Sequence, residues 1–321
     1  MTEQTGAIEA GLPLERRKSS GLWTDAFRRL LRNRLAIIGG ILVIFLFFIA
    51  AVGPLITPWT YYEQHTDEVI ANRNRPLAPM QQIEGVDHLH YLGTDELGRD
   101  LLSRLMDGAR ISVMVALVVQ FVVLVIGIPV GAAAAWFGGR TDSILMRITD
   151  VVYAYPDLLF IILLGVAFKE TFFGRAMDGL LLVFVAIGLT SWVTMARLVR
   201  GQLLSLKETE FVEAAKAIGV SDRKIVTRHL LPNATGPIIV AVTLGIPAAI
   251  LAEATLAFIG IGVQAPRASW GSLVADGNSY VRSFPHLVIF PAMCIAVALI
   301  SFTFLGDGLR DALDPKLKGK Q

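Results

Sequence analysis

Long apolar runs alternate with polar stretches along most of the chain. Six of these runs are long enough to cross a bilayer, because a transmembrane helix needs about 20 mostly apolar residues. They are Leu35–Thr57, Ile111–Phe137, Ile144–Phe168, Gly179–Ala196, Gly236–Gly260 and Leu287–Leu305. The pattern therefore predicts an all-α polytopic membrane protein with six transmembrane helices.

Four charged residues lie inside these runs. In the third run they are Arg147, Asp150 and Asp157, and Pro156 predicts a kink there. A charge at the centre of a membrane helix costs about 2.5–3.5 kcal/mol on insertion scales, so each needs a protein or water partner. The spacing favours an Arg147–Asp150 pair at i and i+3. Glu253, in the fifth run, fits a structural role and a solute path equally well.

Lysine and arginine are distributed unequally between the two sides of these runs. Positive residues accumulate in cytoplasmic segments. They are denser before the first run, between the fourth and fifth runs, and after the sixth run than in the other loops. The pattern predicts that both termini and Ser205–Leu231 are cytoplasmic, whereas Pro58–Asp107 and Ile261–His286 are external.

Composition supports the membrane assignment. Of the 321 residues, 54% are hydrophobic and only 17% are charged. Soluble domains carry about 25% charged residues, so a soluble globular protein is excluded. The net charge of +2 says little, because in a membrane protein the distribution of charge matters more than its sum. Membrane lipid is expected around the chain, and no nucleic-acid partner is expected. The single cysteine, Cys294, excludes an internal disulfide and a metal site with several cysteines.

The chain divides into four segments along its length. Residues 1–21 are expected to form a disordered cytoplasmic tail. Residues 22–110 contain the first transmembrane helix and a long external loop whose C-terminal part is expected to be ordered. Residues 111–315 form a core of five transmembrane helices with a cytoplasmic loop at 205–233, and residues 316–321 form a second cytoplasmic tail.

The cytoplasmic loop contains a polar, helix-forming block. It reads Glu213-Ala-Ala-Lys-Ala-Ile-Gly219 and predicts a helix over Leu206–Ile218. Thr209 is placed to cap this helix, and Gly219 to end it. A second short helix is expected from Ser221 to near Pro232, within the stretch His-Leu-Leu-Pro-Asn.

One face of the first loop helix is apolar. Phe211, Ala214, Ala215 and Ile218 fall at i, i+3, i+4 and i+7, which places them on one narrow stripe. The stripe fits either docking on another protein or an amphipathic helix lying on lipid. Because the stripe is too small for firm membrane binding, docking is favoured.

Two further motifs lie in external loops. The first reads Leu92-Gly-Thr-Asp-Glu-Leu-Gly-Arg-Asp-Leu-Leu-Ser-Arg104, and Thr94 is placed to cap a helix that begins at Asp95. The spacing of this motif does not match a calcium-binding EF-hand. The second motif is Ala268-Ser-Trp-Gly271. In the first motif, possible polar pairs join Arg99, Ser103 and Arg110 to Asp95, Asp100 and Asp107.

These motifs together resemble a family of transport proteins. The block ending at Gly219 resembles the EAA loop of binding-protein-dependent ABC importer permeases. The Ala268–Gly271 segment is similar to the PSWG segment of the oligopeptide, dipeptide and nickel-type permeases, although it carries fewer prolines. The GTDxxGRD signature of that group is matched by Gly93, Thr94, Asp95, Gly98, Arg99 and Asp100.

The resemblance covers nearly the whole chain, from about Leu22 to Pro315, and implies a type I ABC importer permease fold. It implies a second homologous permease that forms a heterodimer with this chain, two ABC ATPase subunits and an external substrate-binding protein. It also implies multi-pass insertion in a bacterial or archaeal cytoplasmic (inner) membrane. The residues expected to dock on an ATPase subunit are Leu206, Phe211, Glu213, Ala214, Ala215, Ile218 and Gly219.

The chain itself is not expected to be an enzyme. It contains no Gly-x-x-x-x-Gly-Lys-Ser/Thr motif for nucleotide phosphates. ATP and Mg would bind to the partner ATPase subunits, and no catalytic residue, cofactor or metal is expected in this chain. The solute path is expected to be lined by Tyr153, Asp157, Thr190, Ser191, Thr243, Glu253 and Thr255.

The resemblance favours short peptides as the solute, with nickel, glutathione or an oligosaccharide as alternatives. An ion-coupled secondary transporter is a further alternative, in which Asp150 and Glu253 would carry the ion. Such transporters are built from inverted repeats with broken helices at the midplane, and the sequence shows no clear repeat. An intramembrane enzyme has no support from any nucleophile–base or metal constellation.

Overall fold

The computed structural model describes residues 22–83 and 89–314. The segments 1–21 and 316–321, expected to be tails, lie outside the described residues. The α-helices are α1 (Leu22–Leu30), α2 (Arg34–Ile56), α3 (Thr66–Ala71), α4 (Leu101–Phe137), α5 (Gly139–Ala154), α6 (Asp157–Phe168), α7 (Phe172–Arg175), α8 (Leu180–Lys207), α9 (Glu210–Ala217), α10 (Asp222–Lys224), α11 (Leu231–Phe258), α12 (Trp270–Asn278) and α13 (His286–Leu313). A 3₁₀ turn, Ala176–Gly179, precedes α8, and a π-helix, Ile225–Leu230, precedes α11.

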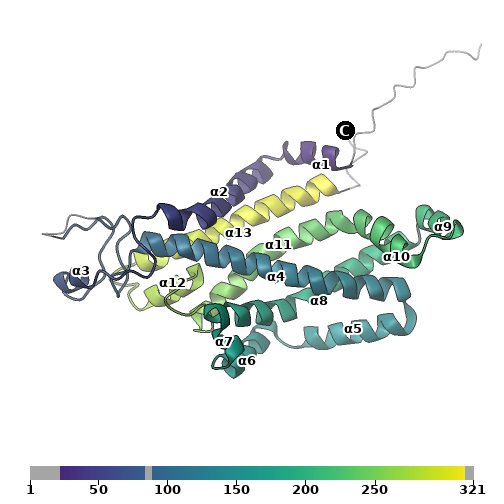
Figure 1. Cartoon of the computed structure of the whole chain (residues 1–321). Helices are drawn as coiled ribbons and strands as arrows, with labels where there is room; N and C mark the ends of the chain where they lie inside the picture. The colour runs from purple at the N-terminus through teal and green to yellow at the C-terminus, as the bar shows by residue number, and fades with distance from the viewer. Residues whose placement is uncertain (1–21, 84–88, 315–321) are drawn as a thin grey trace, which may run out of the picture.

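The long helices lie roughly along one direction and form an elongated bundle (Figure 1). The short helix α3 and the loops beside it lie at one end, and α9 and α10 lie at the other. Helix α4 runs through the middle and packs most extensively on α8, while α13 packs on α2 and α11. The bundle therefore has two polar ends, far apart, that are joined by long apolar helices.

Five of these helices are long and apolar enough to cross a membrane. They are α2, α4, α8 with the short turns before it, α11 with the turns before it, and α13. The third predicted run is divided between α5 and α6, which are bent by 79°. Tyr155 at the break is extended (φ −80°, ψ 135°), because a proline at the next position disfavours the helical conformation. The expected kink at Pro156 is therefore a sharp break.

Two predicted boundaries were wrong. Helix α4 begins at Leu101 rather than Ile111, because the polar turns at its start are buried by protein instead of facing lipid. The helix after Ser221 does not stop near Pro232 but continues as α11. Pro232 is tolerated because it occupies the first turn of α11, where a missing N–H costs little.

Small residues allow the backbones of α4 and α8 to approach closely. A Cβ added at Gly131 would lie 2.4 Å from the carbonyl oxygen of Ala196, and one at Gly127 would lie 2.8 Å from the Cβ of Met195. Gly188 of α8 meets Val122 of α4 in the same way. Membrane helices associate through such close contacts, because lipid provides no hydrophobic driving force between them.

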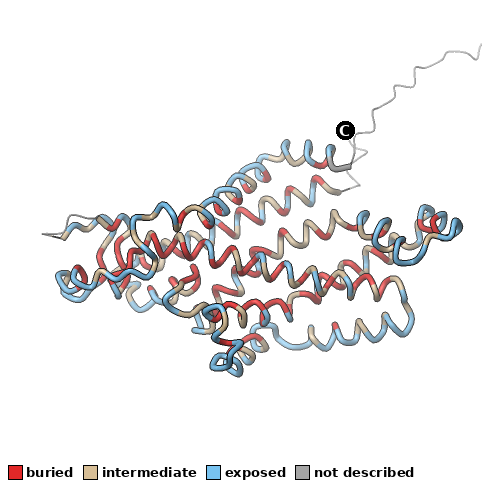
Figure 2. The backbone as a smooth tube through the Cα atoms, in the orientation of Figure 1, coloured by how far each residue is buried: buried red, intermediate tan, exposed pale blue. Residues whose placement is uncertain are grey.

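Figure 2 shows that burial follows the inner faces of the bundle, while the outer faces of the long helices are exposed. On α2 the exposed side chains include Ile41, Ile44 and Phe45, at 60%, 71% and 52%. Large apolar side chains that face outward suit a helix surrounded by lipid rather than water. The exposed apolar surface thus agrees with the predicted membrane location.

Candidate functional site

Helix α9 is separated from α8 by two residues. Thr209 has the extended backbone of a cap residue (φ −88°, ψ 150°), but its hydroxyl donates to the carbonyl of Leu206 at 2.6 Å. The predicted single helix over Leu206–Ile218 was therefore wrong: Leu206 belongs to the last turn of α8, and α9 turns away after Glu208. The change of direction makes α9 a separate short element at the end of the bundle (Figure 1).

Gly219 ends α9 in a left-handed conformation with φ +77°. Its N–H donates to the carbonyl of Lys216 at 3.0 Å, and the N–H of Val220 donates to that of Ala215 at 3.0 Å. This pair of bonds is the Schellman motif, which strongly favours glycine. No described atom lies within 4 Å of a Cβ built at Gly219, so its surface is open to a partner.

The four residues of the predicted apolar stripe do not share one surface. Ala215 is buried, together with Val212, and both contribute to the core beside Ile225 of the π-helix. Phe211 and Ile218 are 40% and 81% exposed, and Ala214 and Glu213 are also exposed. The outward surface of α9 is therefore Phe211, Ala214 and Ile218 at i, i+3 and i+7, whereas Ala215 anchors the helix. The sequence analysis missed Val212, although its three-residue spacing to Ala215 marks the inner face.

Two lysines join the ends of α8 and α9 to the end of α4. Lys207 Nζ donates to the carbonyl oxygens of Ala135 and Trp136, at 3.2 and 2.7 Å. The ammonium groups of Lys207 and Lys216 also lie over the Trp136 ring, 5.3 and 5.5 Å from its centre. Cations are favourable at the C-terminal end of a helix, where unpaired carbonyls carry partial negative charge. The contact couples α9 to the longest helix of the bundle.

The GTDxxGRD segment forms a compact turn at the opposite end of α4. Gly93 and Gly98 have φ values of +81° and +76°, and a Cβ at either would collide with the carbonyl of Leu77 or His65. The prediction that Thr94 caps a helix was wrong: Thr94 is fully buried and accepts a hydrogen bond from the Leu77 N–H at 3.0 Å. Glycine is required here because the backbones touch and φ is positive.

The cap of α4 is Asp100 instead. Its carboxylate accepts from the Ser103 N–H at 2.7 Å and from the Ser103 hydroxyl at 2.8 Å. Its other oxygen lies 2.8 Å from Nδ1 of His90. Burial alone would raise the pKa of Asp100, but the hydrogen bonds from His90 and Ser103 outweigh it, so the pKa of this carboxyl is lowered. The aspartate therefore stays charged at neutral pH and holds the helix start.

Asp95 is the centre of a buried ion cluster. One oxygen accepts from the backbone N–H groups of Leu97 and Arg99 at 2.9 Å, and the other accepts from Arg99 Nε at 2.7 Å and from Arg104 Nη1. Arg104 also reaches Asp276 of α12 at 3.3 Å. The predicted Asp95–Arg99 and Asp100–Ser103 pairs are confirmed, whereas Arg110 is exposed. The motif therefore connects the start of α4 to α12.

The Ala268–Gly271 segment packs against the same helix. Ser269 caps α12 in a reciprocal capping box with Ser272. The Trp270 indole donates to the carbonyl of Leu105 at 3.1 Å, and its backbone N–H donates to the hydroxyl of Ser112 at 3.3 Å. That hydroxyl donates to Glu253 at 3.3 Å. These bonds join α4, α11 and α12 through one buried network.

Glu253 consequently does not face an open path in this subunit. Its exposure is 1%, and it lies between α4, α11 and the start of α12. A buried polar group that bonds to neighbouring helices serves to hold them together. Glu253 is therefore part of a buried polar network in this subunit, and its expected place near a solute path stays a prediction.

The charged residues of α5 pair with α8, so the expected Arg147–Asp150 pair was wrong. Asp150 accepts from Arg197 at 2.7 Å, and the Arg197 guanidinium lies over the Tyr153 ring at 4.4 Å. Asp142 accepts two bonds of 2.6 Å from Arg200. Helix α5 crosses the apolar region beside α8, so the nearest opposite charges belong to α8 rather than to the next turn of α5.

The structure does not bring the seven expected path residues together. The hydroxyls of Thr190, Thr243 and Thr255 each donate to a carbonyl of their own helix, at 3.0, 2.9 and 2.8 Å. Ser191 is half-buried on α8. Tyr153 and Asp157 are exposed on either side of the break between α5 and α6. Only these last two offer polar groups on an open surface of the isolated subunit.

Comparison with known proteins gives the family. Residues 127–319 match the family described as the binding-protein-dependent transport system inner membrane component. Residues 21–79 match the N-terminal transmembrane domain of oligopeptide transport permease C. The first match spans more than half of the chain. The chain belongs to this family. It is therefore a membrane permease subunit of an ABC importer and not itself an enzyme.

Curated relatives cover almost the whole permease. The oligopeptide transport system permease protein OppC of Bacillus subtilis (strain 168) is 39% identical over 94% of this chain and 92% of its own length. The dipeptide transport system permease protein DppC of the same organism is 42% identical over 94% of this chain and 88% of its own. The glutathione transport system permease protein GsiD of Pectobacterium atrosepticum is 37% identical over 97% of both chains.

A solved structure supports the predicted fold class. A chain of the MetNI methionine ABC transporter, in an inward-facing conformation, aligns with a TM-score of 0.53 at 20% identity. The alignment covers 66% of this permease and 96% of that chain. The type I importer permease fold is thereby confirmed.

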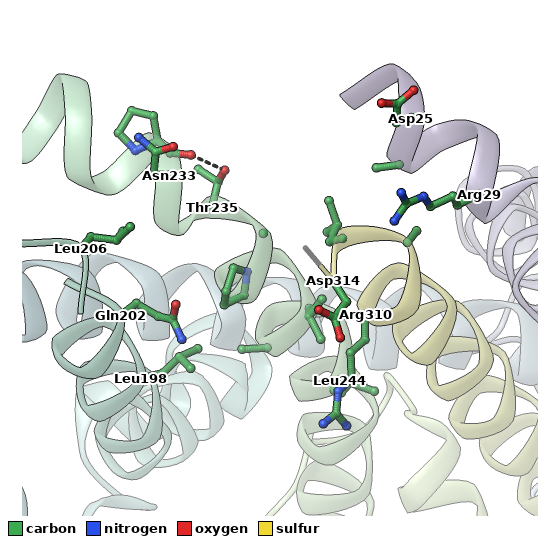
Figure 3. A pocket seen from close by; sticks show the side chains of 18 residues that line it. Asp25, Arg29, Leu198, Gln202, Leu206, Asn233, Thr235, Leu244, Arg310 and Asp314 are labelled. Carbon is green, nitrogen blue, oxygen red and sulfur yellow. Dashed lines mark hydrogen bonds between the residues drawn. The ribbon is translucent and has the colours of Figure 1, made fainter. Parts of the chain in front are cut away.

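The permease has a large cavity that the sequence analysis did not find. It has a volume of about 830 Å³ and lies between α1, α8, α11 and α13, at the end of the bundle that carries α9. Figure 3 shows Gln202 and Leu198 on α8, and Asn233 and Thr235 on α11, facing the space beside Arg310. Its lining mixes short polar and aliphatic side chains with the charged Asp25, Arg29, Arg310 and Asp314. Only the packing of four helices that are distant in sequence creates it, so no local motif marks it.

The ion cluster around Asp95 gives the first testable prediction. Replacing Asp95 by alanine leaves Arg99 and Arg104 buried without their shared partner, and the expected loss of stability is about 3–5 kcal/mol. The matched control is Glu170→Ala, which breaks the exposed Arg175–Glu170 pair and should change stability little. Thermal unfolding of the purified permease in detergent measures both changes, and equal midpoints for the two variants would contradict the role of Asp95.

Proposed function

We propose that this permease moves short peptides into the cell, with its partners supplying the solute and the energy. The observation that carries the proposal is α9, whose apolar outer surface and glycine end stand free of the rest of the chain. A free helix of this kind needs a partner protein, and the family to which the chain belongs is binding-protein-dependent. Two ATPase subunits, of which one receives α9, fit this requirement.

The proposed coupling runs through two contacts of α9. Phe211, Ala214 and Ile218 would enter a groove of the ATPase, and the exposed carboxylate of Glu213 would accept hydrogen bonds there. Lys216 of α9 lies over the Trp136 ring and would transmit a displacement of α9 to the end of α4, where Lys207 of α8 binds the Trp136 carbonyl. Val212 and Ala215 transmit it to the π-helix that leads into α11. Nucleotide-driven movement of the ATPase would thus move two long helices together.

The proposed orientation places α9 on the cytoplasmic side. The end that carries α9 is also where α1 and the last turn of α13 lie (Figure 1). The stretches flanking these elements hold most of the lysines and arginines counted in the sequence. Both termini would therefore be cytoplasmic, and the GTDxxGRD turn would face the binding protein.

The proposed path uses a second permease, homologous to this one. Alternating access requires two halves that move against each other, and this chain supplies one such half. The cavity near Gln202 and Thr235 supplies space on the cytoplasmic side. Its neutral polar side chains on α8 and α11 would give a peptide weak hydrogen bonds, and Arg29, Arg310, Asp25 and Asp314 on its other side would meet the charged ends of a peptide. Weak contacts favour release, because tight binding to a path slows exit.

Relatives narrow the solute to short peptides. Two relatives are named for oligopeptides and dipeptides, and a third is named for glutathione, which is itself a tripeptide. Glutathione is therefore the second candidate. An uptake experiment distinguishes short peptides from nickel or an oligosaccharide as the solute. It also distinguishes ATP from an ion gradient as the energy source.

The orientation predicts opposite labelling of two single cysteines. With Cys294 replaced by serine, a cysteine at Glu63 should react with a membrane-impermeant maleimide added to intact cells. A cysteine at Ser221 should react only after the membrane is opened. Both positions are exposed, so accessibility in the fold does not separate them. Reaction of both from outside would overturn the proposed topology.

If α9 couples the permease to an ATPase subunit, changes at its docking surface should reduce transport. We expect Gly219→Val to reduce ATP-dependent uptake of a labelled tripeptide by about tenfold or more, equivalent to roughly 1.4 kcal/mol of lost docking. Valine strains the left-handed backbone and adds bulk to the docking surface. Glu213→Ala should reduce uptake without changing membrane insertion. The assay uses the whole transporter in liposomes, with glutathione, nickel and an oligosaccharide as competing solutes.

A matched control separates docking from backbone strain. Gly260 also has positive φ (+85°) with no described atom near its Cβ, but it lies at the other end of α11. Gly260→Val should therefore retain uptake. Normal uptake by both Gly219→Val and Glu213→Ala would refute the docking role, and uptake driven by an ion gradient without ATP would refute the importer mechanism itself.

The position of the cavity predicts which residues of the proposed solute path are accessible to water. A cysteine at Thr235 should react with a small charged thiol reagent, and the rate should fall when ATP is trapped in the ATPase. A cysteine at Glu253 should stay unreactive in every state, because the position is 1% exposed and enclosed by three helices. Reactivity at 253 together with protection at 235 would show that the path lies elsewhere.

A further inference from the structure

Two histidines and a glutamate meet at the end of the bundle opposite α9. His65 precedes α3, and Glu68 lies one turn further along that helix. His90 comes from a separate stretch of the loop, before the GTDxxGRD turn. One ligand atom from each residue lies within 4.8 Å of the other two. Their side chains are 12%, 7% and 1% exposed, so the group is largely enclosed by protein.

The distances suit a tetrahedral metal ion. His90 Nε2 lies 3.3 Å from Glu68 Oε2, and His65 Nδ1 lies 3.6 Å from Glu68 Oε1. Two ligand atoms bound about 2.0–2.2 Å from a tetrahedral ion are separated by about 3.3–3.6 Å. The imidazole rings are inclined at 60° with centres 4.9 Å apart, and one nitrogen of each ring lies within 4.8 Å of the other and of a Glu68 oxygen.

A second-layer carboxylate orients His90 as metal sites require. Nδ1 of His90 lies 2.8 Å from Asp100, which is itself held by the N–H and hydroxyl of Ser103. A histidine that donates Nδ1–H to a carboxylate directs its unprotonated Nε2 toward the metal, and such partners raise metal affinity. Here Nε2 is the atom that faces Glu68.

We propose that His65, Glu68 and His90 bind one divalent transition-metal ion, for which zinc is the best match. Two imidazoles and one carboxylate favour zinc over magnesium or calcium, which prefer oxygen ligands. The three residues leave one position of a tetrahedral ion for a fourth donor. The ion would clamp α3 to the turn that starts α4, and would thus fix the loop that faces the binding protein. This site is separate from the coupling helix, so its failure would leave the proposed transport function unaffected.

Zinc content tests the proposal directly. The assembled transporter is loaded with Zn²⁺, passed through a desalting column and analysed for metal, with affinity measured against a chromophoric chelator. His65→Gln and Glu68→Gln should each remove one zinc per transporter. His229→Gln and Glu63→Gln make the same chemical changes outside the cluster and should retain it. Equal zinc content in the wild type and in both cluster variants would overturn the proposal.

Fluorescence provides a test that does not depend on the cluster variants folding. The Trp59 ring lies 4.5 Å from His65 and 5.6 Å from His90, measured between ring centres. Co²⁺ in the cluster should quench this tryptophan, and an excess of Zn²⁺ should restore its emission. Trp59→Phe should lose the quenched component and keep its zinc. Identical Co²⁺ titrations of the wild type and of Trp59→Phe would show that no metal enters the cluster, in which case the three residues form a hydrogen-bonded network only.

Discussion

The close approach of α4 and α8 is the contact around which the other helices are arranged. Because lipid provides no hydrophobic driving force between helices, they associate through close packing. The glycines at 127, 131 and 188 let α4 and α8 approach closely. At 37 residues, α4 is about 55 Å long. It therefore reaches from the polar turn at one end of the bundle to α9 at the other. Within the described residues α4 is the longest single labelled helix, and the continuous run from Asp222 to Phe258 that includes α11 has the same length.

Polar contacts at both ends of α4 make this helix a mechanical connection. At its start, Asp100 caps the helix, and Arg104 reaches Asp276 of α12. At its end, Lys207 binds the final carbonyls beside α9. A long helix is stiff along its axis, so a shift imposed at one end arrives at the other unless the helix bends. The same helix that supports the bundle is thus suited to carry a signal between its two polar ends.

Hydropathy predicted the five membrane helices that the structure shows, because the requirement for about 20 apolar residues is local and strong. It did not predict that the third run is divided into two helices bent by 79°. Gly219 was also predictable, since its spacing from the end of a short helix needs only local geometry. Boundaries were less predictable. The first turns of α4 are polar, and only the surrounding loop and α12 bury Arg104 and Asp107. Hydropathy measures transfer to lipid, and therefore cannot recognise a segment that is buried by protein.

In the candidate sites too, features that depend on local sequence were predictable, and features that depend on packing between helices were not. Gly93 and Gly98 belong to a sequence motif, and the positive φ of each explains why the motif has glycine there. Which residues of α9 are exposed depends instead on the side that the π-helix covers. One apolar stripe was expected, but Val212 and Ala215 face inward and leave a different stripe exposed. Asp150 was assigned a neighbour on its own helix, and its partner lies on α8 instead. Pairing between helices depends on packing that a single sequence does not encode locally.

Glu253 illustrates why an ionisable residue in a membrane helix is a weak guide to the solute path. Its burial cost requires a partner, and Ser112 with the backbone of Trp270 supplies a connected polar network. The free-energy cost of exposing a charged group to lipid makes such a residue conspicuous in the sequence. The same cost favours its burial against polar groups of other helices. A path for a polar solute has the opposite requirement, since its lining has to stay solvated and to bind weakly. The cavity between α8 and α11 meets that requirement with Gln202, Asn233 and Thr235, which are unremarkable in the sequence because solvated polar groups cost little. In this permease, Glu253 and the charges of α5 bond to neighbouring helices, whereas the cavity is lined by neutral polar side chains on α8 and α11 and by the charged Asp25, Arg29, Arg310 and Asp314 on its α1 and α13 side.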